Sequence, residues 1–164
     1  MGPIVVYADA GDDQEGRATT GTITFSGTSP LGWASRKQDI VTLSMTEAEY
    51  VSAAAGAQEE IWAGRLVIEV IGPSAPPELR IDSEGARKLA NNPVYHRRTK
   101  HIDRRHHFIR ERVTNGDIEL SWVPGRDNWA DIFTKRLGRA ELTAQRKRIG
   151  MMSLREWLSD QGGV

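Results

Sequence analysis

Cysteine is absent from the chain, which excludes disulfide bonds and zinc sites built from thiolates. Long apolar runs are absent too. No stretch approaches the roughly 20 residues that a helix needs to span a bilayer, and the N-terminus lacks the basic-then-apolar pattern of a secretion signal. These absences predict an intracellular protein in a reducing compartment, without a membrane partner.

A net charge of either sign is also missing, because 22 basic and 22 acidic residues cancel. The charges are nevertheless unevenly placed: residues 1–60 hold nine acids and three bases, whereas residues 86–115 hold nine bases and two acids. An acidic region that holds cations, together with a basic face that binds phosphates, is typical of a nucleic-acid-processing protein. The alternative is a basic helix face that is only solvated.

The order of the expected elements indicates one α/β domain. At 164 residues, 38% of them apolar, the chain is long enough for a sizeable core. Strands are expected at residues 4–9, 20–26, 31–35, 78–82 and 118–123, and helices from Ser44 and over residues 84–91, 99–113 and 139–158. Three strands in a meander, the second of them half exposed, followed by strand–helix alternation, predict a five-stranded mixed sheet flanked by helices.

The helix that begins at Ser44 carries two signals. Ser44 and Glu47 fit a capping box, in which each side chain accepts a hydrogen bond from the other residue's backbone N–H. This gives Glu47 a structural task and leaves Glu49 without one. Farther along, large apolar residues recur at helical spacing and are expected to lie in the core: Trp62, Leu66 and Val70.

Acidic residues stand at the ends of separate elements. Asp9 ends the first strand, Asp82 ends the fourth, and Asp131 lies in the opening of a helix expected to begin near residue 127 or 128. The carboxyl ends of parallel strands meet at one edge of a sheet, where ligands collect. Because like charges repel, carboxylates gathered there favour a site for a hard divalent cation. From local spacing alone, Asp127 remains an alternative to Asp131, and Asp131 has a capping role as its own alternative.

Several motifs together resemble one family. They are Tyr7-Ala8-Asp9-Ala10, Ser35-Arg36-Lys37-Gln38, Leu43-Ser44-Met45-Thr46-Glu47-Ala48-Glu49-Tyr50, Asp82-Ser83, Arg98-Thr99-Lys100-His101-Ile102-Asp103 with His107-Phe108-Ile109-Arg110-Glu111, and Ala130-Asp131-Ile132-Phe133-Thr134-Lys135. In order and spacing they are similar to the ribonuclease H domain of copia-type (Pseudoviridae) LTR-retrotransposon polyproteins. The resemblance implies a ribonuclease H-like fold. It also implies an endonuclease that cuts the RNA strand of RNA–DNA hybrids during reverse transcription, leaving 5′-phosphate and 3′-hydroxyl ends.

The resemblance assigns the catalytic and metal-binding roles to Asp9, Glu49, Asp82 and Asp131. It selects Glu49 over Glu47, in agreement with the capping argument, and Asp131 over Asp127. It implies two Mg²⁺ ions, about 4 Å apart, for which Mn²⁺ can substitute. Without metal, mutual repulsion is expected to raise the pKa values of these carboxylates, so that metal binding releases protons and stabilises the fold. Many ribonucleases H carry a histidine in the loop before the last acid; this chain has none there, which leaves Arg126 and Asp127 as candidate replacements.

Residues predicted to bind the hybrid fall into two groups. Phosphate contacts are assigned to the basic residues Arg97, Arg98, Lys100, Arg104 and Arg105. Contacts beside the acids that read 2′-hydroxyls are assigned through the resemblance to Gly11, Ser44, Thr46 and Glu84. Among the tryptophans able to stack on bases, Trp33 and Trp122 are expected to be buried instead.

The histidines gather in the basic segment, at His96, His101, His106 and His107. The neighbouring cations oppose a bound zinc ion. We therefore expect His106 to pack between Ile102 and Ile109, and keep His101 and His107 as candidates for a phosphate contact or a bond to an acid.

The expected organisation is a cloning remnant at residues 1–3, a ribonuclease H domain at 4–150 and a C-terminal helical extension at 151–164. The resemblance further implies a reverse transcriptase joined to the domain in its polyprotein, and a cytoplasmic location in virus-like particles, with access to the nucleus. Two other classes stay open. One is a non-catalytic hybrid-binding or connection module with the same fold, and the other is a zinc-stabilised nucleic-acid-binding domain built on the histidines.

Overall fold

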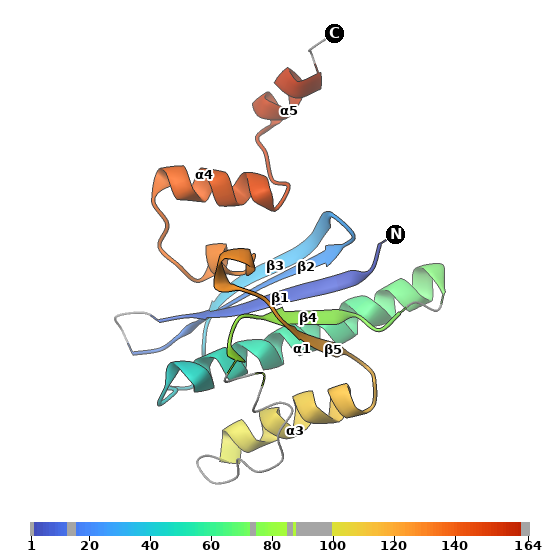
Figure 1. Cartoon of the computed structure of the whole chain (residues 1–164), viewed down its shortest axis with the longest axis vertical. Coiled ribbons are helices and arrows are strands. Elements are labelled where there is room, and N and C mark those ends of the chain that lie inside the picture. The colour runs from blue at the N-terminus through green and yellow to red at the C-terminus, as the bar shows by residue number, and fades with distance from the viewer. Residues whose placement is uncertain (1, 13–15, 73–74, 85–86, 88–99, 162–164) are drawn as a thin grey trace.

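The computed structural model describes residues 2–12, 16–72, 75–84, 87 and 100–161. Five strands form one sheet in the order β3-β2-β1-β4-β5 (Figure 1). The antiparallel strands are β1 (Ile4–Gly11), β2 (Thr19–Ser26) and β3 (Ser29–Lys37), and the strands parallel to β1 are β4 (Glu78–Ile81) and β5 (Glu119–Trp122). The predicted five-stranded mixed sheet is confirmed.

Helices cover both faces of the sheet (Figure 1). On one face lie α1 (Met45–Ile71) and α3 (Lys100–Thr114), and on the other lie the short 3-10 helices η1 (Gly125–Asp127) and η2 (Asp131–Phe133), then α4 (Arg139–Arg148) and, farther out, α5 (Leu154–Gln161). Within the described ranges, none of these helices combines the length and the apolar character needed to cross a membrane.

The core on the α1 side depends on small residues. Ala53, Ala54 and Ala57 are buried against the sheet. A Cβ atom added to Gly56 would lie only 2.8 Å from Leu79 Cδ1 and 3.0 Å from the Ala8 Cβ. The absence of bulk on this face therefore lets the backbone of α1 approach β1 and β4 closely.

The core on the opposite face is aromatic. The ring of Trp129 stacks on Tyr7, with the centroids 5.1 Å apart, and meets Phe25 edge-on at 4.9 Å. Trp129 therefore anchors the loop between β5 and η2 to the sheet. The expectation that Trp33 and Trp122 are the buried tryptophans is wrong, because they are 57% and 46% exposed at an edge strand and a strand end.

Two predictions of exposure are also wrong. β2 is buried on both faces rather than half exposed, because α1 and η2 both pack on it. The buried Thr20 hydroxyl is hydrogen-bonded to the Ser52 hydroxyl at 3.0 Å and accepts from the Gln38 amide at 3.1 Å. The stripe expected in the core is turned to solvent, since the small residues of α1 occupy the sheet-facing side. The exposed fractions are 63% for Trp62, 43% for Leu66 and 67% for Val70.

The helix expected near residue 127 or 128 is replaced by two 3-10 turns, η1 and η2. Asn128 separates them in an extended conformation. Its side chain is buried, donates to the Ala8 carbonyl at 3.0 Å and accepts from the Ala130 N–H at 3.2 Å. These bonds tie the loop to β1 and prevent a continuous helix.

Candidate active site

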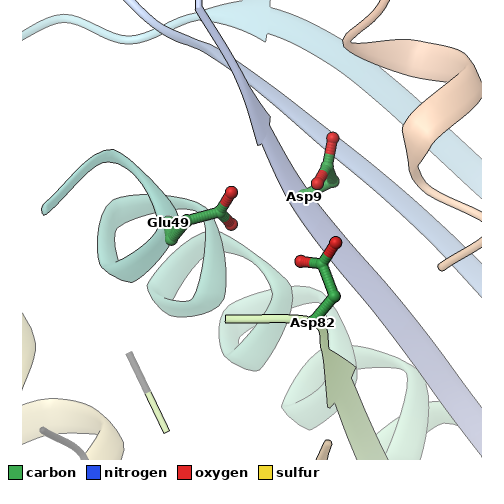
Figure 2. Close-up of side chains that lie close together, drawn as sticks. All are labelled: Asp9, Glu49 and Asp82. Carbon is green, nitrogen blue, oxygen red and sulfur yellow. The ribbon is translucent and has the colours of Figure 1, made fainter. Parts of the chain in front are cut away.

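Three of the four predicted carboxylates converge at one end of the sheet (Figure 2). Asp9 comes from β1, Glu49 from the beginning of α1, and Asp82 from the residue that follows β4. One carboxylate oxygen from each residue lies within 4.8 Å of the others. Oxygens at this spacing can share a hard divalent cation.

The register of the sheet brings two of these acids together. β1 and β4 are parallel, with Tyr7 opposite Arg80, so that Asp9 and Asp82 follow two residues later on adjacent strands. Asp9 is 2% exposed, because neighbouring strands flank it on both sides. The two acids therefore lie together at the carboxyl ends of the parallel strands, the edge of the sheet where the sequence placed them.

The capped start of α1 supplies the third acid. Ser44 is the N-cap, and its hydroxyl accepts a hydrogen bond from the Glu47 N–H at 3.3 Å. The Glu47 carboxylate accepts from the Leu43 N–H at 2.7 Å, one residue before the position that a capping box predicts. Glu47 is thus engaged in capping, and Glu49, one turn into the helix, faces Asp9 and Asp82 (Figure 2).

The segment that carries Asp131 rests directly on the backbone of β1 and β2. A Cβ atom at Gly11 would lie 2.5 Å from the Thr134 carbonyl oxygen, and one at Gly21 would lie 2.6 Å from Thr134 Cγ2. Ser35 adds a hydrogen bond from its hydroxyl to the Phe133 carbonyl at 2.6 Å. Only glycine at these two strand positions allows the segment to come this close.

Asp131 itself stays outside the cluster of three described acids that lie within reach of one another. Its Oδ2 accepts a charge-assisted hydrogen bond from Lys135 Nζ at 2.6 Å. Its Oδ1 is buried and has no hydrogen-bond partner among the residues that the structure describes. A buried carboxylate oxygen without a donor is a group that a bound cation would satisfy.

Asp9, Glu49 and Asp82 have raised pKa values, as expected without metal, but burial is the largest cause. Burial, with smaller contributions from the charges of Asp131 and Asp82, raises the pKa of Asp9 to about 6. Burial and the charges of Asp9 and Asp82 raise the pKa of Glu49 to about 8. The pKa of Asp82 is raised by burial and by Asp131, against a hydrogen bond from Asn128. The repulsion predicted from the sequence is real but secondary.

Three residues without a predicted role hold the acids. Thr134 donates its hydroxyl to Asp9 Oδ2, and the Asn128 amide bonds Asp82. Burial alone would lower the pKa of Lys135. The hydrogen bond to Asp131 and the charges of Asp131, Asp9 and Asp82 raise it by more, so the pKa of Lys135 lies above its ordinary value. Lys135 is therefore a cation beside the acids. The signal for Thr134 and Lys135 was their place three and four residues after Asp131, one helical turn away.

The donor set fits a hard divalent metal. All the candidate ligands are carboxylates, the chain contains no cysteine, and Asp131 Oδ1 is a buried acceptor without a donor among the described residues. These features agree with a divalent-metal site at the acidic triad.

A cavity of about 720 Å³ lies next to the carboxylates. Its lining includes Gly11 and Thr134 and three basic residues, which are Lys37, Lys135 and Arg136. Basic side chains beside an acidic cluster suit a phosphate backbone passing the site.

Of the residues predicted to bind the hybrid, Gly11 lines this cavity, Ser44 caps α1, Thr46 lies in the first turn of α1, and Glu84 pairs with Arg87 at 3.0 Å. Arg105 lies on α3 and is half-buried. Arg97, Arg98 and His96 lie outside the described residues, as does most of the helix predicted over 84–91. The same applies to the side chains of Lys100, His101, Arg104 and His106, whereas the described His107 is exposed on α3.

No protein-family model matches the sequence. Two relatives are retrovirus-related Pol polyproteins. The polyprotein from transposon RE2 of Arabidopsis thaliana is 39% identical over 152 residues, which cover 90% of this chain and 10% of the polyprotein. The polyprotein from transposon TNT 1-94 of Nicotiana tabacum is 37% identical over 151 residues, covering 90% and 11%. The chain thus spans about a tenth of the length of these relatives.

Solved structures with the same architecture are ribonuclease H domains. The N-terminal RNase H domain of rv2228c from Mycobacterium tuberculosis superposes with a TM-score of 0.61 at 16% identity, over 90% of this chain and 99% of that one. LC11-RNase H1, isolated from compost and solved in complex with an RNA/DNA hybrid, superposes with a TM-score of 0.59 at 18% identity, over 80% and 93%. At these identities the likeness shows the fold alone. With the Pol relatives, it shows that the chain belongs with the ribonuclease H domains of copia-type LTR-retrotransposon polyproteins.

Proposed function

We propose that this domain hydrolyses the RNA strand of RNA–DNA hybrids during retroelement reverse transcription, leaving 5′-phosphate and 3′-hydroxyl ends. The observation that carries the proposal is the convergence of Asp9, Glu49 and Asp82 at the carboxyl ends of the parallel strands of a ribonuclease H fold. Carboxylates gathered in this way are costly without a cation and useful with one.

Asp9, Glu49 and Asp82 would hold one Mg²⁺ ion, and Asp131 would complete the ligands of a second, with Mn²⁺ as a substitute. When bound, these ions would supply an acidified water and stabilise the leaving 3′ oxygen. The chain's own contribution is to fix the ligands. Asn128 holds Asp82, and Thr134 holds Asp9. Asp127, one of the two candidate replacements for the missing loop histidine, accepts a hydrogen bond from Arg148 on α4.

The hybrid would lie over the acids, with its backbone in the cavity lined by Lys37, Lys135 and Arg136. The complex of LC11-RNase H1 with an RNA/DNA hybrid supports this class of ligand for the fold. Gly11, Ser44, Thr46, Glu84 and the basic residues from Arg97 to Arg105 remain the proposed contacts. We further propose that the domain, at residues 4–150, is joined to a reverse transcriptase, in line with its Pol polyprotein relatives. Its proposed location is in cytoplasmic particles with access to the nucleus.

The test is cleavage of an end-labelled RNA strand in an RNA–DNA hybrid with Mg²⁺, Mn²⁺ or EDTA. We expect metal-dependent cleavage that Asp82→Asn lowers by at least about a hundredfold, because the amide cannot neutralise a cation. Asp117→Asn is the matched control, since Asp117 lies in the turn between α3 and β5, where it pairs with Arg112 at 2.9 Å, outside the acidic triad.

Equal cleavage by both variants would contradict the assignment of the site. Salt-sensitive binding of the hybrid without cleavage, in the wild type and with each metal, would favour the non-catalytic hybrid-binding or connection module. Stoichiometric zinc in the purified protein would favour the zinc-stabilised class.

A further inference from the structure

Lys135 is placed at the metal-binding carboxylates by two independent features. Its Nζ lies 2.6 Å from Asp131 Oδ2, and its charge also acts on Asp9, Glu49 and Asp82. Thr134, the preceding residue, is bound to Asp9, and the close contact of Thr134 with Gly11 and Gly21 fixes the backbone. The backbone that leads into Lys135 is therefore held beside the acids, and the ammonium group can leave Asp131 by a change in the side chain alone.

The side chain of Lys135 has room to change position. It is 50% exposed, whereas the side chain of Asp131 is 18% exposed. Lys135 also lines the cavity beside the acids, together with Lys37 and Arg136. An ammonium group that leaves Asp131 would remain in this cavity, where a backbone phosphate of a nucleic acid would accept it.

We propose that Lys135 is a built-in competitor of the divalent ion, which neutralises Asp131 in the metal-free domain and must leave that carboxylate before Asp131 can bind metal. This inference rests on the proposed function, because it takes Asp131 as a metal ligand. It explains why Asp131 stands apart from the described triad while its second oxygen is buried without a donor. Lys135 is thus a positioning residue that sets the affinity of the site for its ion.

The size of the effect follows from the competition. A ligand that binds only the competent form has its apparent dissociation constant raised by the reciprocal of the competent fraction. If Asp131 is released from Lys135 in about a tenth of the molecules, the dissociation constant is raised about tenfold. Removing the ammonium should therefore tighten binding of the weaker ion by up to about tenfold. The metal-free domain should become less stable, because Asp131 then repels Asp9 and Asp82 without compensation.

The experiment is titration of the metal-free domain with Mn²⁺ by isothermal calorimetry, with thermal unfolding in EDTA and in saturating Mn²⁺. The variants are Lys135→Met, which keeps the length of the side chain without the charge, and Lys135→Arg, which keeps the charge. Lys147→Met is the matched control, because Lys147 loses the same charge on α4, where it pairs with Glu156 at 3.6 Å.

We expect Lys135→Met to bind Mn²⁺ more tightly than the wild type and to have a lower melting temperature in EDTA. Saturating Mn²⁺ should raise its melting temperature by more than that of the wild type. Lys135→Arg and Lys147→Met should bind like the wild type. Unchanged or weaker binding of Mn²⁺ by Lys135→Met would overturn the inference. If the lysine were merely structural, its loss would lower the stability of the domain without raising its affinity for Mn²⁺. If the wild type binds no ion at all, gain of binding in Lys135→Met supports the competition and no gain overturns it.

Failure of the proposed ribonuclease activity and failure of the Lys135 competition give different results. A domain that shows the Lys135 effect on Mn²⁺ binding but leaves the RNA strand of a hybrid intact refutes the ribonuclease and keeps the competitor. A domain that cuts the hybrid while Lys135→Met binds Mn²⁺ like the wild type refutes the competitor and keeps the ribonuclease.

Discussion

Two glutamates on α1, Glu49 and Glu60, lie about three helical turns apart, and burial raises the pKa of both. Glu49 reaches a pKa of about 8 in the company of Asp9 and Asp82. Glu60 reaches about 9 through burial and the more distant charges of Glu78 and Glu119. It is 0% exposed, and both its oxygens lack a hydrogen-bond partner among the described residues.

The two glutamates differ in their neighbouring carboxylates and in their exposure to solvent. Glu49 is only partly buried, and its carboxylate lies within 4.8 Å of two others, so that a cation could bind all three. Glu60 is enclosed, and the described structure offers it no second ligand within reach. A raised pKa alone therefore does not mark a site; convergence of ligands does.

The largest expected difference between the two glutamates is in the rate of hybrid cleavage after each is changed to glutamine. Glu49→Gln should lower hybrid cleavage by about a hundredfold or more, because a metal ligand loses its charge. Glu60→Gln should leave cleavage within about twofold, since Glu60 is remote from the reacting phosphate. The measurement is the single-turnover cleavage rate of a labelled hybrid at saturating Mg²⁺. Comparable losses in both variants would show that α1 acts as a whole and would break the comparison.

Much of the fold could be predicted from the sequence, because its signals are local, and three of the four predicted acids do lie together. β-branched runs predicted the strands, the pair Ser44 and Glu47 predicted the start of α1, and the motifs around Asp9 and Asp82 predicted the site. Asp131 was predicted as a ligand, and whether it binds metal remains a prediction.

What the sequence missed depends on contacts between distant segments. The exposure of Trp62 could not be predicted, because both sides of α1 are apolar and only the approach to the sheet decides which one is buried. The bond from Lys135 to Asp131 and the enclosure of Glu60 likewise depend on packing. The domain boundary at residue 150 remains a prediction.

The dependence of stability on pH should show whether Glu60 is protonated in the folded protein. Its folded pKa of about 9 lies above the unfolded value of 4.5, so its contribution to stability is fully present below pH 4.5 and is lost as the pH rises through about 9. Between these limits only the folded state holds the proton, and this residue lowers the free energy of unfolding by up to about 1.4 kcal/mol per pH unit. Urea unfolding in EDTA between pH 5.5 and 8.5 should show this slope in the wild type and a flatter one in Glu60→Gln. Identical slopes would show that Glu60 is ionised in the folded protein.

Gly56 lies between the two glutamates on α1. Because it has no side chain, it sets how closely this part of α1 approaches the sheet. Gly56→Ala places a Cβ atom 2.8 Å from Leu79 Cδ1 and 3.0 Å from the Ala8 Cβ, a crowding that should cost about 1–3 kcal/mol. Chemical denaturation gives the loss of stability. Gly72→Ala is a poor control because that glycine has a φ of 92°, whereas Gly32→Ala meets no atom within 4 Å and should be tolerated. A stabilised Gly56→Ala would mean that helix propensity outweighs the contact.

The smallest expected effect concerns the exposed side of the same helix. Trp62→Ser removes a side chain that is 63% exposed, and surface substitutions of this kind usually change stability by less than about 0.5 kcal/mol. Val67→Ser, on the buried side, should cost several times more, because Val67 is 4% exposed and packs in the core beneath the sheet. The two variants differ in which side of α1 they change, so their free energies of unfolding measure the orientation of the helix directly. If Trp62→Ser is the more destabilising of the two, the side of α1 that carries Trp62 is the buried one, and the orientation of the helix described above is wrong.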